Sequence, residues 1–329
     1  MRDRILTGDR PTGKLHLGHY LGSLKNRVEL QNKYEEFIIV ADVQALTTNF
    51  ENPEMLKVNV RQVTEDYLSV GIDPEVATIF VQSMIPEIAE LTIFYSMFTT
   101  VNSLKHNPTI KTEAAQYGYA DMTYGFLGYP VSQAADITFC KAKLVPVGVD
   151  QLPHVEVTRK IVRRFNDLYG EVLVEPEALV GEAARLVGLD GKNKMSKSLN
   201  NAIWLSDMPE EVVKKVKTAV TDTARIKKDD PGHPDVCTVY EYHKYFSKDE
   251  VDNVREMCQK GTIGCVACKT KLAQSINNVL TPINERRQKY KENPALIDEV
   301  LKSGTERARN AAKETMREVR EAMQINYFH

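Results

Sequence analysis

Phe37-Ile38-Ile39-Val40-Ala41 decides the fold class, because this uninterrupted apolar run leaves no polar face. A strand with one solvent-exposed face alternates apolar and polar residues. A strand of a parallel sheet is covered on both faces and reads as a continuous apolar run. The pattern returns at Arg4-Ile5-Leu6-Thr7-Gly8, Thr78-Ile79-Phe80-Val81 and Leu144-Val145-Pro146-Val147-Gly148. Helical patterns separate the runs, so the sequence predicts an α/β fold with a doubly wound parallel sheet that binds ligands at the carboxyl ends of its strands.

Outside these runs the chain is mostly helical. Residues 85–140 read as a helical insertion, and strand signals largely vanish after residue 200. A polar cap at Ser206-Asp207 precedes Pro209 and predicts a helix start, and the segment from Pro294 to Met323 reads as one long helix. We therefore expect an α/β catalytic domain at 1–190, a mobile loop at 191–200, an all-helical C-terminal domain at 201–305 and a terminal helix at 306–329.

Composition excludes several classes of protein. The 329 residues are 42% hydrophobic and 27% charged, a globular balance with room for two domains. The net charge of −2 rules out a basic nucleic-acid coat but not a local basic face. No apolar run approaches the ~20 residues of a membrane helix, and the N-terminus does not resemble a signal peptide. We expect a cytoplasmic protein without a membrane partner.

The motif His16-Leu17-Gly18-His19 stands where the first predicted strand passes into the first helix. Helix N-termini collect phosphates, because their backbone N–H groups are free and the helix dipole is positive there. Two histidines three positions apart add donors to the same phosphates, and a glycine between them lets a flat base approach the backbone. The competing interpretation is a pair of surface histidines beside a packing glycine.

A second motif, Lys194-Met195-Ser196-Lys197-Ser198, follows Asp190-Gly191 before the helical half. Two ammonium groups on a glycine-flanked loop suit the negative charge of a leaving pyrophosphate. Alone, such a segment reads more often as a lysine-rich surface loop. The two motifs together favour nucleotide chemistry.

In this order, the two motifs resemble the two signatures of class I aminoacyl-tRNA synthetases. The likeness extends to the tryptophanyl/tyrosyl subgroup through the stretches at residues 7–13, 80–83, 129–137 and 145–151. The resemblance implies a nucleotide-binding, Rossmann-like catalytic domain that uses ATP with Mg²⁺ and acts on tRNA. A small-molecule nucleotidyltransferase also uses His-x-Gly-His but needs neither the lysine loop nor the helical half. A non-catalytic tRNA-binding paralogue is a further alternative, against which the intact motifs argue.

The resemblance also implies roles for individual residues. Those implied for stabilising phosphate charge in catalysis are His16, His19, Lys194 and Lys197. Those implied for binding ATP are Arg10, Pro11, Thr12, Gly18, His19, Gly148, Val149, Asp150, Leu186, Lys194, Met195, Ser196, Lys197 and Ser198. Those implied for binding the amino acid are Leu6, Gly8, Tyr129, Gln133, Asp136 and Gln151.

The choice between tryptophan and tyrosine depends on the pocket residues. A phenol O–H both donates and accepts, and tyrosyl members of the subgroup meet it with a Tyr on the first strand where this chain has Leu6. An indole offers one donor, for which Asp136 is the expected acceptor, and a larger apolar body. Gln133 departs from the Met often found in tryptophanyl members. Tryptophan is favoured, so the expected partners are tryptophan, ATP and tRNA(Trp), with tyrosine as the alternative substrate.

Four of the five cysteines, Cys237, Cys258, Cys265 and Cys268, form a C-x20-C-x6-C-x2-C pattern in the helical half. Four thiolates can hold Zn²⁺ or a [4Fe–4S] cluster, and spacing alone does not choose between them. Resemblance to an iron–sulfur site of some bacterial members of the subgroup favours [4Fe–4S], with Zn²⁺ as the alternative. Cys140 reads as a buried apolar residue.

Lysine and arginine clusters recur in the helical half, each interleaved with acidic residues. Each alone reads as a solvated helix face, but together they can follow a tRNA backbone. Members of the subgroup pair through the mid-chain insertion, so the resemblance also implies a homodimer.

Overall fold

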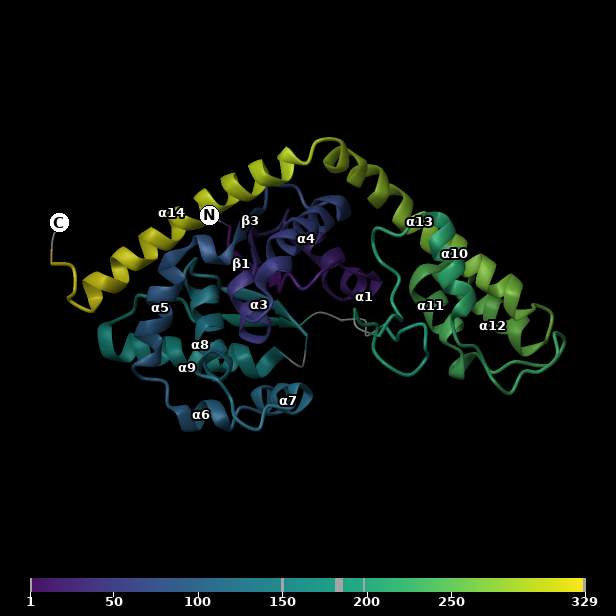
Figure 1. The fold of residues 1–329 in the computed structure, drawn as a ribbon, viewed down its shortest axis with the longest axis horizontal. Coiled ribbons are helices and arrows are strands. Elements are labelled where there is room, and N and C mark those ends of the chain that lie inside the picture. Colours follow the sequence, from purple (N-terminus) through teal and green to yellow (C-terminus); the bar gives the residue numbers. More distant parts are fainter. Residues whose placement is uncertain (1, 149–150, 181–185, 198, 328–329) are drawn as a thin grey trace.

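A five-stranded parallel sheet is the centre of the fold in the computed structural model, which describes residues 2–148, 151–180, 186–197 and 199–327 (Figure 1). The strands are β1 (Arg4–Asp9), β2 (Glu35–Val40), β3 (Thr78–Val81), β4 (Leu144–Val147) and β5 (Glu177–Val180), in the order β3-β2-β1-β4-β5. The four predicted strands and the doubly wound class are confirmed. β5 was not predicted.

Helices surround the sheet. Those of the first half are α1 (Leu17–His19), the π-helical η1 (Tyr20–Leu24), α2 (Lys25–Leu30), α3 (Asp42–Asn49), α4 (Leu56–Val70), α5 (Pro86–Ser96), α6 (Val101–Lys105), α7 (Pro108–Tyr117), α8 (Tyr124–Thr138) and α9 (Leu152–Tyr169). Short 3-10 turns lie at η2 (Pro53–Met55) and η3 (Gln82–Met84). Helices α5 to α8 follow β3 and precede β4 along the chain.

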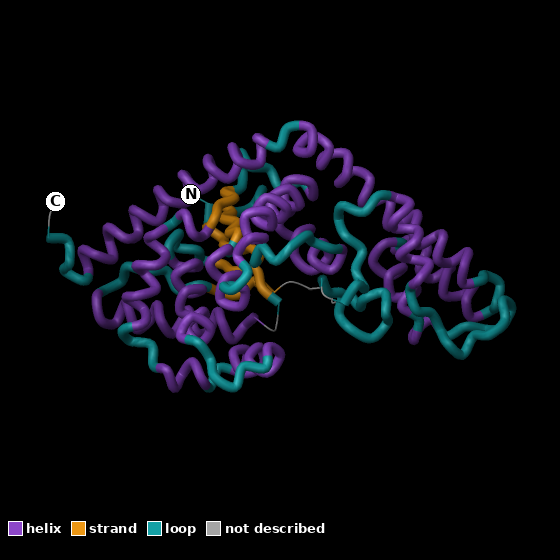
Figure 2. The backbone as a smooth tube through the Cα atoms, viewed as in Figure 1, coloured by secondary structure: helices purple, strands orange, loops and turns teal. Residues whose placement is uncertain are grey.

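The C-terminal half is helical, as predicted (Figure 2). Its helices are α10 (Pro209–Thr218), η5 (Pro234–Val236), α11 (Thr238–Phe246), η6 (Lys248–Glu250), α12 (Val251–Gln259), α13 (Cys265–Glu292) and α14 (Ala295–Ala322). The expected boundary at residue 306 falls inside α14. None of the helices in the described ranges is long and apolar enough to span a membrane.

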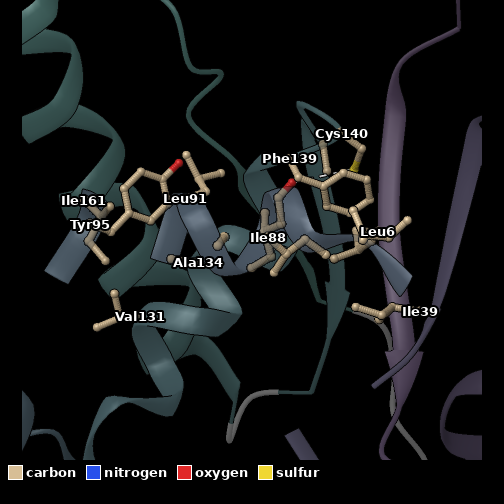
Figure 3. Close-up of a cluster of buried hydrophobic side chains, with 14 of the residues drawn as sticks. Leu6, Ile39, Ile88, Leu91, Tyr95, Val131, Ala134, Phe139, Cys140 and Ile161 are labelled. Atoms are coloured by element: carbon tan, nitrogen blue, oxygen red, sulfur yellow. Dashed lines mark hydrogen bonds between the residues drawn. The ribbon is translucent and has the colours of Figure 1, made fainter. Parts of the chain in front are cut away.

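The apolar run of β2 is buried on both sides of the sheet. Phe37 and Ile39 point into one core with Leu6, and Ile38 and Val40 point into a second core with Leu17. Figure 3 shows part of the first core, where Cys140 lies beside Phe139, and Cys140 is fully buried as predicted. The two cores explain why the sequence of this strand does not alternate.

Helix α14 packs along the edge strand β3, and the preceding helix α13 contacts both α4 of the first half and α10 and α11 of the helical half (Figure 1). Val81 N donates to Thr305 Oγ1 at 3.3 Å, and Arg307 donates to the carbonyl of Ala77 at 3.2 Å. A side chain on Gly304 would place its Cβ 1.9 Å from the Ile79 carbonyl oxygen, so only glycine allows this contact. The edge of the sheet is therefore covered rather than exposed to other chains.

Glu36 is an unusual residue of the second face of β2. Its side chain is 1% exposed, and among the described residues neither carboxylate oxygen has a hydrogen-bond partner. Burial raises the pKa of Glu36 to about 8, although the charge of Arg27 opposes the shift. The folded protein therefore holds a proton that the unfolded chain releases above its ordinary value of 4.5.

We expect the free energy of unfolding to fall as pH rises from about 5 to about 8, by up to about 1.4 kcal/mol per unit, because the unfolded chain releases the Glu36 proton that the folded protein keeps. The stability attributed to this proton is complete below the unfolded-state pKa and is lost as pH rises through the folded-state pKa. Glu36→Gln removes the titration, so this component of the slope should disappear. Urea unfolding of both proteins at several pH values measures it, and equal slopes would contradict the assignment.

Candidate active site

A cleft of about 890 Å³ opens where β1 and β4 end, at the point where the strand order reverses. Ligands bind at such switch points in open α/β sheets, because the loops there diverge. The predicted site residues that line the cleft are Leu6, Gly8, Arg10, Gly18, His19, Gln133, Asp136, Gly148, Gln151 and Lys194. The structure thus brings together residues from β1, α1, α8, the end of β4 and the lysine loop.

The two histidines cap the first helix with their own side chains. Gly18 N donates to His16 Nδ1 at 3.1 Å, and His16 N donates to His19 Nδ1 at 3.2 Å. Each Nδ1 is therefore an acceptor, which leaves the Nε2–H of each neutral ring as the donor. A Cβ on Gly18 would lie 2.9 Å from the His16 ring, so the turn requires glycine at this position.

Both imidazoles are neutral at pH 7. Burial lowers the pKa of His16 to about 2, with His19, Lys197 and Lys194 adding to the shift. Burial also lowers the pKa of His19 to about 4, against the opposing charge of Asp9. Each ring therefore has an Nε2–H donor and carries no positive charge.

Asp9 ends β1 behind the histidines and is held by two buried partners. Arg27 Nη1 donates to Asp9 Oδ2 at 2.8 Å, and Tyr67 Oη donates to the same oxygen at 2.7 Å. Burial alone would raise the pKa of Asp9, but the charge of Arg27 lowers it to about 2. This ionised group fixes the end of β1 beneath the cleft.

The lysine loop and the segment that follows it run beside the first helix. Leu17 N donates to Ile203 O and Leu205 N donates to Leu15 O, each at 3.0 Å. Lys194 lines the cleft, whereas Lys197 Nζ donates to Gly13 O at 2.7 Å. The two predicted lysines thus have different positions, one in the cleft and one held to the loop after β1.

Other predicted ATP-binding residues lie outside the cleft lining. Leu186 and Met195 are 1% and 2% exposed in the second core, where Met195 N donates to Leu186 O. Lys197 Nζ also donates to Thr12 Oγ1 at 3.2 Å. Pro11 is buried beside Arg10, and Ser196 N donates to Asn201 Oδ1. Val149, Asp150 and Ser198 lie outside the described residues.

Asp136 is buried at the cleft between two glutamines that the sequence did not single out. Gln82 Nε2 donates to its Oδ1 at 2.8 Å, and Gln44 Nε2 donates to its Oδ2 at 3.4 Å. Gln44 N also donates to Gln82 Oε1, which fixes that amide with its N–H toward Asp136. Burial raises the pKa of Asp136 to about 7, and the amide hydrogen bonds limit the rise.

Tyr129 lies behind the cleft, 2% exposed, with its hydroxyl 3.1 Å from His154 Nε2. The Arg10 guanidinium stands over its ring at 5.3 Å from the centroid. Burial raises the pKa of Tyr129, and the nearby carboxylate of Glu113 adds to the shift. Glu113 and His154 line the cleft, so the insertion contributes an acidic group that sequence reasoning missed.

None of the four clustered cysteines, each of which is among the described residues, forms a disulfide, and two of them lie beside Arg225. Arg225 Nη1 lies 3.9 Å from both the Cys258 and Cys265 sulfurs, and Cys268 Sγ lies 3.5 Å from His243 Nε2. Burial raises the pKa of Cys268 to about 12, and the charges of the other three thiols add to the rise. Across the described ranges, no three His, Cys, Asp or Glu side chains are arranged to hold a metal ion, so the metal prediction is not confirmed.

A cleft at the carboxyl ends of a parallel sheet, lined by His19, Asp136 and Lys194, stands where α/β proteins of the nucleotide-binding class hold their ligands. The family model for "tRNA synthetases class I (W and Y)" matches residues 2–281. The chain belongs to this family of class I synthetases, and it is therefore an ATP-dependent ligase.

Relatives resemble the chain over nearly its full length. It is 50% identical to a tryptophan–tRNA ligase of Streptococcus mutans, with 98% of each chain covered, and 48% identical to one of Streptococcus agalactiae at the same coverage. The structure of tryptophanyl-tRNA synthetase from Campylobacter jejuni, complexed with ADP and tryptophan, is similar with a TM-score of 0.88 at 33% identity, covering 98% of this chain and 99% of that one.

We expect two substitutions of His19 to separate its two ring nitrogens. Asn places an acceptor where Nδ1 stands, so His19→Asn should keep the helix cap but slow adenylate formation about 100-fold or more by removing a phosphate donor. Gln places a donor where Nε2 stands, so His19→Gln should keep most of the rate but cost about 1 kcal/mol of stability. Thermal melts and single-turnover rates measure both, and equal rate losses would contradict the division.

Proposed function

We propose that this chain activates tryptophan with ATP to tryptophanyl-adenylate and transfers the tryptophanyl group to tRNA(Trp). The observation that carries the proposal is Asp136, a buried carboxylate in a cleft that also contains Leu6 and the phosphate-type helix start. Its relatives at 50% identity are tryptophan–tRNA ligases, and a similar structure was solved with ADP and tryptophan.

In the first step, a tryptophan carboxylate oxygen attacks the α-phosphorus of ATP. A new C–O–P linkage forms, the bond between the α-phosphorus and the bridging oxygen breaks, and pyrophosphate leaves with that electron pair. A carboxylate is already a nucleophile at pH 7, so no general base is needed, and the neutral His16 and His19 are not required as bases. Catalysis comes from alignment of the reactants and from donors and cations around the phosphates.

Each group has a defined task in this proposal. The Gly18 turn and the Nε2–H of His19 hold phosphate oxygens, and Lys194 neutralises charge on the leaving pyrophosphate with the Mg²⁺ that accompanies ATP. Lys197 joins them when it leaves Gly13 and Thr12. In the second step, a hydroxyl of the terminal tRNA ribose attacks the adenylate carbonyl, AMP leaves, and the hydroxyl proton passes to solvent.

Selection of tryptophan over tyrosine rests on the buried end of the cleft. The lone pairs of Asp136 accept from Gln82 and Gln44, and a further lone pair accepts the indole N–H. Leu6 offers no polar partner to a phenol hydroxyl, which would be left with an unmet hydrogen bond. This end of the cleft therefore favours a substrate with one donor.

ATP–pyrophosphate exchange tests the function with tryptophan and tyrosine offered separately. We expect exchange with tryptophan and little with tyrosine. Exchange driven by tyrosine would establish the tyrosyl alternative. Tight tRNA binding without exchange would instead indicate a non-catalytic paralogue.

The pKa of Asp136 predicts a pH dependence of substrate binding. Protonation below about pH 7 replaces a lone pair by a donor, so the KM for tryptophan should rise as pH falls through that value. Asp136→Asn should raise KM by the equivalent of about 1–3 kcal/mol and remove the dependence. Exchange kinetics from pH 5.5 to 8 check this, and a pH-independent KM in the unsubstituted enzyme would refute it.

We propose a homodimer that pairs through the insertion, in a cytoplasmic enzyme. Exposed apolar side chains lie on α5, on α6 and between them, where Ile93, Met97 and Val101 are 53%, 68% and 56% exposed. Burying such residues against a second copy removes apolar surface from water. None of the five cysteines, all of which lie in the described ranges, forms a disulfide, and this fits a reducing compartment.

We expect sedimentation at micromolar concentration to give a dimer and Met97→Lys to give monomers. Phe50, which is 56% exposed on the first half outside the insertion, provides the matched control as Phe50→Lys. A stable, active monomer of the unsubstituted enzyme would contradict the dimer.

We also propose that Cys237, Cys258, Cys265 and Cys268 hold a [4Fe–4S] cluster, with Zn²⁺ as the alternative. The donor chemistry fits, because the charges of Cys237, Cys258 and Cys265 add to the raised pKa of Cys268, and Arg225 Nη1 lies 3.9 Å from two of the sulfurs, to which it can donate. Gly232 leaves the space beside Cys258 open, since a Cβ there would lie 2.6 Å from Sγ. The cluster would stabilise the helical half, and neither chemical step depends on it.

Anaerobic purification tests the cysteine site. A brown protein with four iron atoms per chain is expected, by the stoichiometry of the cluster. Cys265→Ser should lose the colour, whereas Cys140→Ala, which changes a fully buried cysteine far away in the sequence, should keep it. A colourless protein with stoichiometric zinc would establish the zinc alternative.

A further inference from the structure

The turn that contains His16 is held from two sides by backbone hydrogen bonds of Leu15. Leu15 O accepts from Leu205 N, which belongs to the segment after the lysine loop. Leu15 N donates to Asp66 Oδ2 at 2.8 Å, and Leu15 is fully buried. The position of His16 therefore depends directly on a side chain of α4.

The other oxygen of Asp66 is bound by the helical half. Arg287 of α13 donates from Nη2 to Asp66 Oδ1 at 2.6 Å, across 221 positions of sequence. Arg287 and Asp66 are 3% and 2% exposed, and Glu65 lies 3.2 Å from the second guanidinium nitrogen. A buried carboxylate needs such a partner, because loss of the arginine leaves an uncompensated charge that must move or take a proton.

Movement or protonation of Asp66 would disturb its Oδ2, which accepts the hydrogen bond from Leu15 N. We propose that Arg287 and Asp66 are positioning residues for the phosphate site, which hold the His16 turn in register with the lysine loop and make that register depend on the placement of α13. The expected effect on kinetics rests on the proposed function. The expected displacement of the His16 turn does not depend on that function.

The neighbouring arginine provides a matched control. Arg286 Nε donates to Ser69 O at 2.7 Å and its Nη2 to Val70 O at 3.3 Å, so it also ties α13 to α4. These carbonyls lie at the end of α4 and none of them binds the loop before His16. Arg286→Met and Arg287→Met therefore remove contacts between the same two helices, but only the second breaks the link to Leu15.

Trp204 provides a readout that needs no substrate. It is the only tryptophan of the chain, and its ring lies 6.0 Å from that of His16. Its emission therefore reports the turn and the segment after the lysine loop together. Arg287→Met should shift the wavelength of the Trp204 emission maximum, and Arg286→Met should leave it unchanged. Arg287→Lys should give a smaller shift than Arg287→Met.

In ATP–pyrophosphate exchange, Arg287→Met should lower kcat about 10- to 100-fold, the scale of a misplaced reacting group, and leave the KM for tryptophan within twofold. Asp66→Asn keeps an acceptor for Leu15 N but loses the ion pair. Its kcat should lie between the kcat of Arg287→Met and that of the unsubstituted enzyme. Arg286→Met should keep kcat within twofold of the unsubstituted enzyme, even if it lowers thermal stability as much as Arg287→Met does.

Equal kcat losses for Arg286→Met and Arg287→Met, or unshifted Trp204 emission in Arg287→Met, would overturn the inference and indicate a merely structural ion pair. Failure of the unsubstituted enzyme to exchange with tryptophan would count against the proposed function alone, because the fluorescence comparison uses no substrate.

Discussion

Burial of β1 on both faces and both edges is the constraint on which the rest of this molecule depends. The chain leaves β1 toward β2 and β3 on one side, and later returns to β4 and β5 on the other. Parallel pairing makes all five carboxyl ends point the same way, so the loops after β1 and β4 part over a common cleft. Arg10, the His16 turn and Gly148 are at one place for this reason, although their positions in the sequence are far apart.

The charge distribution of the cleft follows from burial. The histidines are too desolvated to be cations, so the positive charge of the cleft comes from Arg10, from Arg27, which is paired with Asp9, and from Lys194, nearly 180 residues later in the chain. Asp9, ionised by Arg27, adds a negative charge beneath the turn. The cleft thus combines neutral hydrogen-bond donors with cationic side chains, and such a lining suits a polyanionic ligand.

Sequence reasoning predicted what local periodicity and local motifs encode. The strands β1 to β4 were found because apolar runs of this kind need two buried faces, whereas β5 was missed because Glu177 and Val180 are exposed at a sheet edge. Asp136 was found by its motif, but Gln44 and Gln82 were not singled out, since hydrogen bonds across 92 and 54 positions leave no spacing signal. The lysine motif was treated as one unit, yet Lys194 lines the cleft while its neighbour Met195 is buried in the core.

Helix α14 can cover the edge of the sheet only late in the synthesis of the protein. Thr305, which caps the β3 backbone, follows its partner Val81 by 224 positions. During synthesis on the ribosome, β3 therefore emerges long before the helix that covers its edge, at ~5–20 residues per second. For that interval the nascent sheet presents unpaired backbone groups, and a prematurely terminated chain would keep them open to other polypeptides.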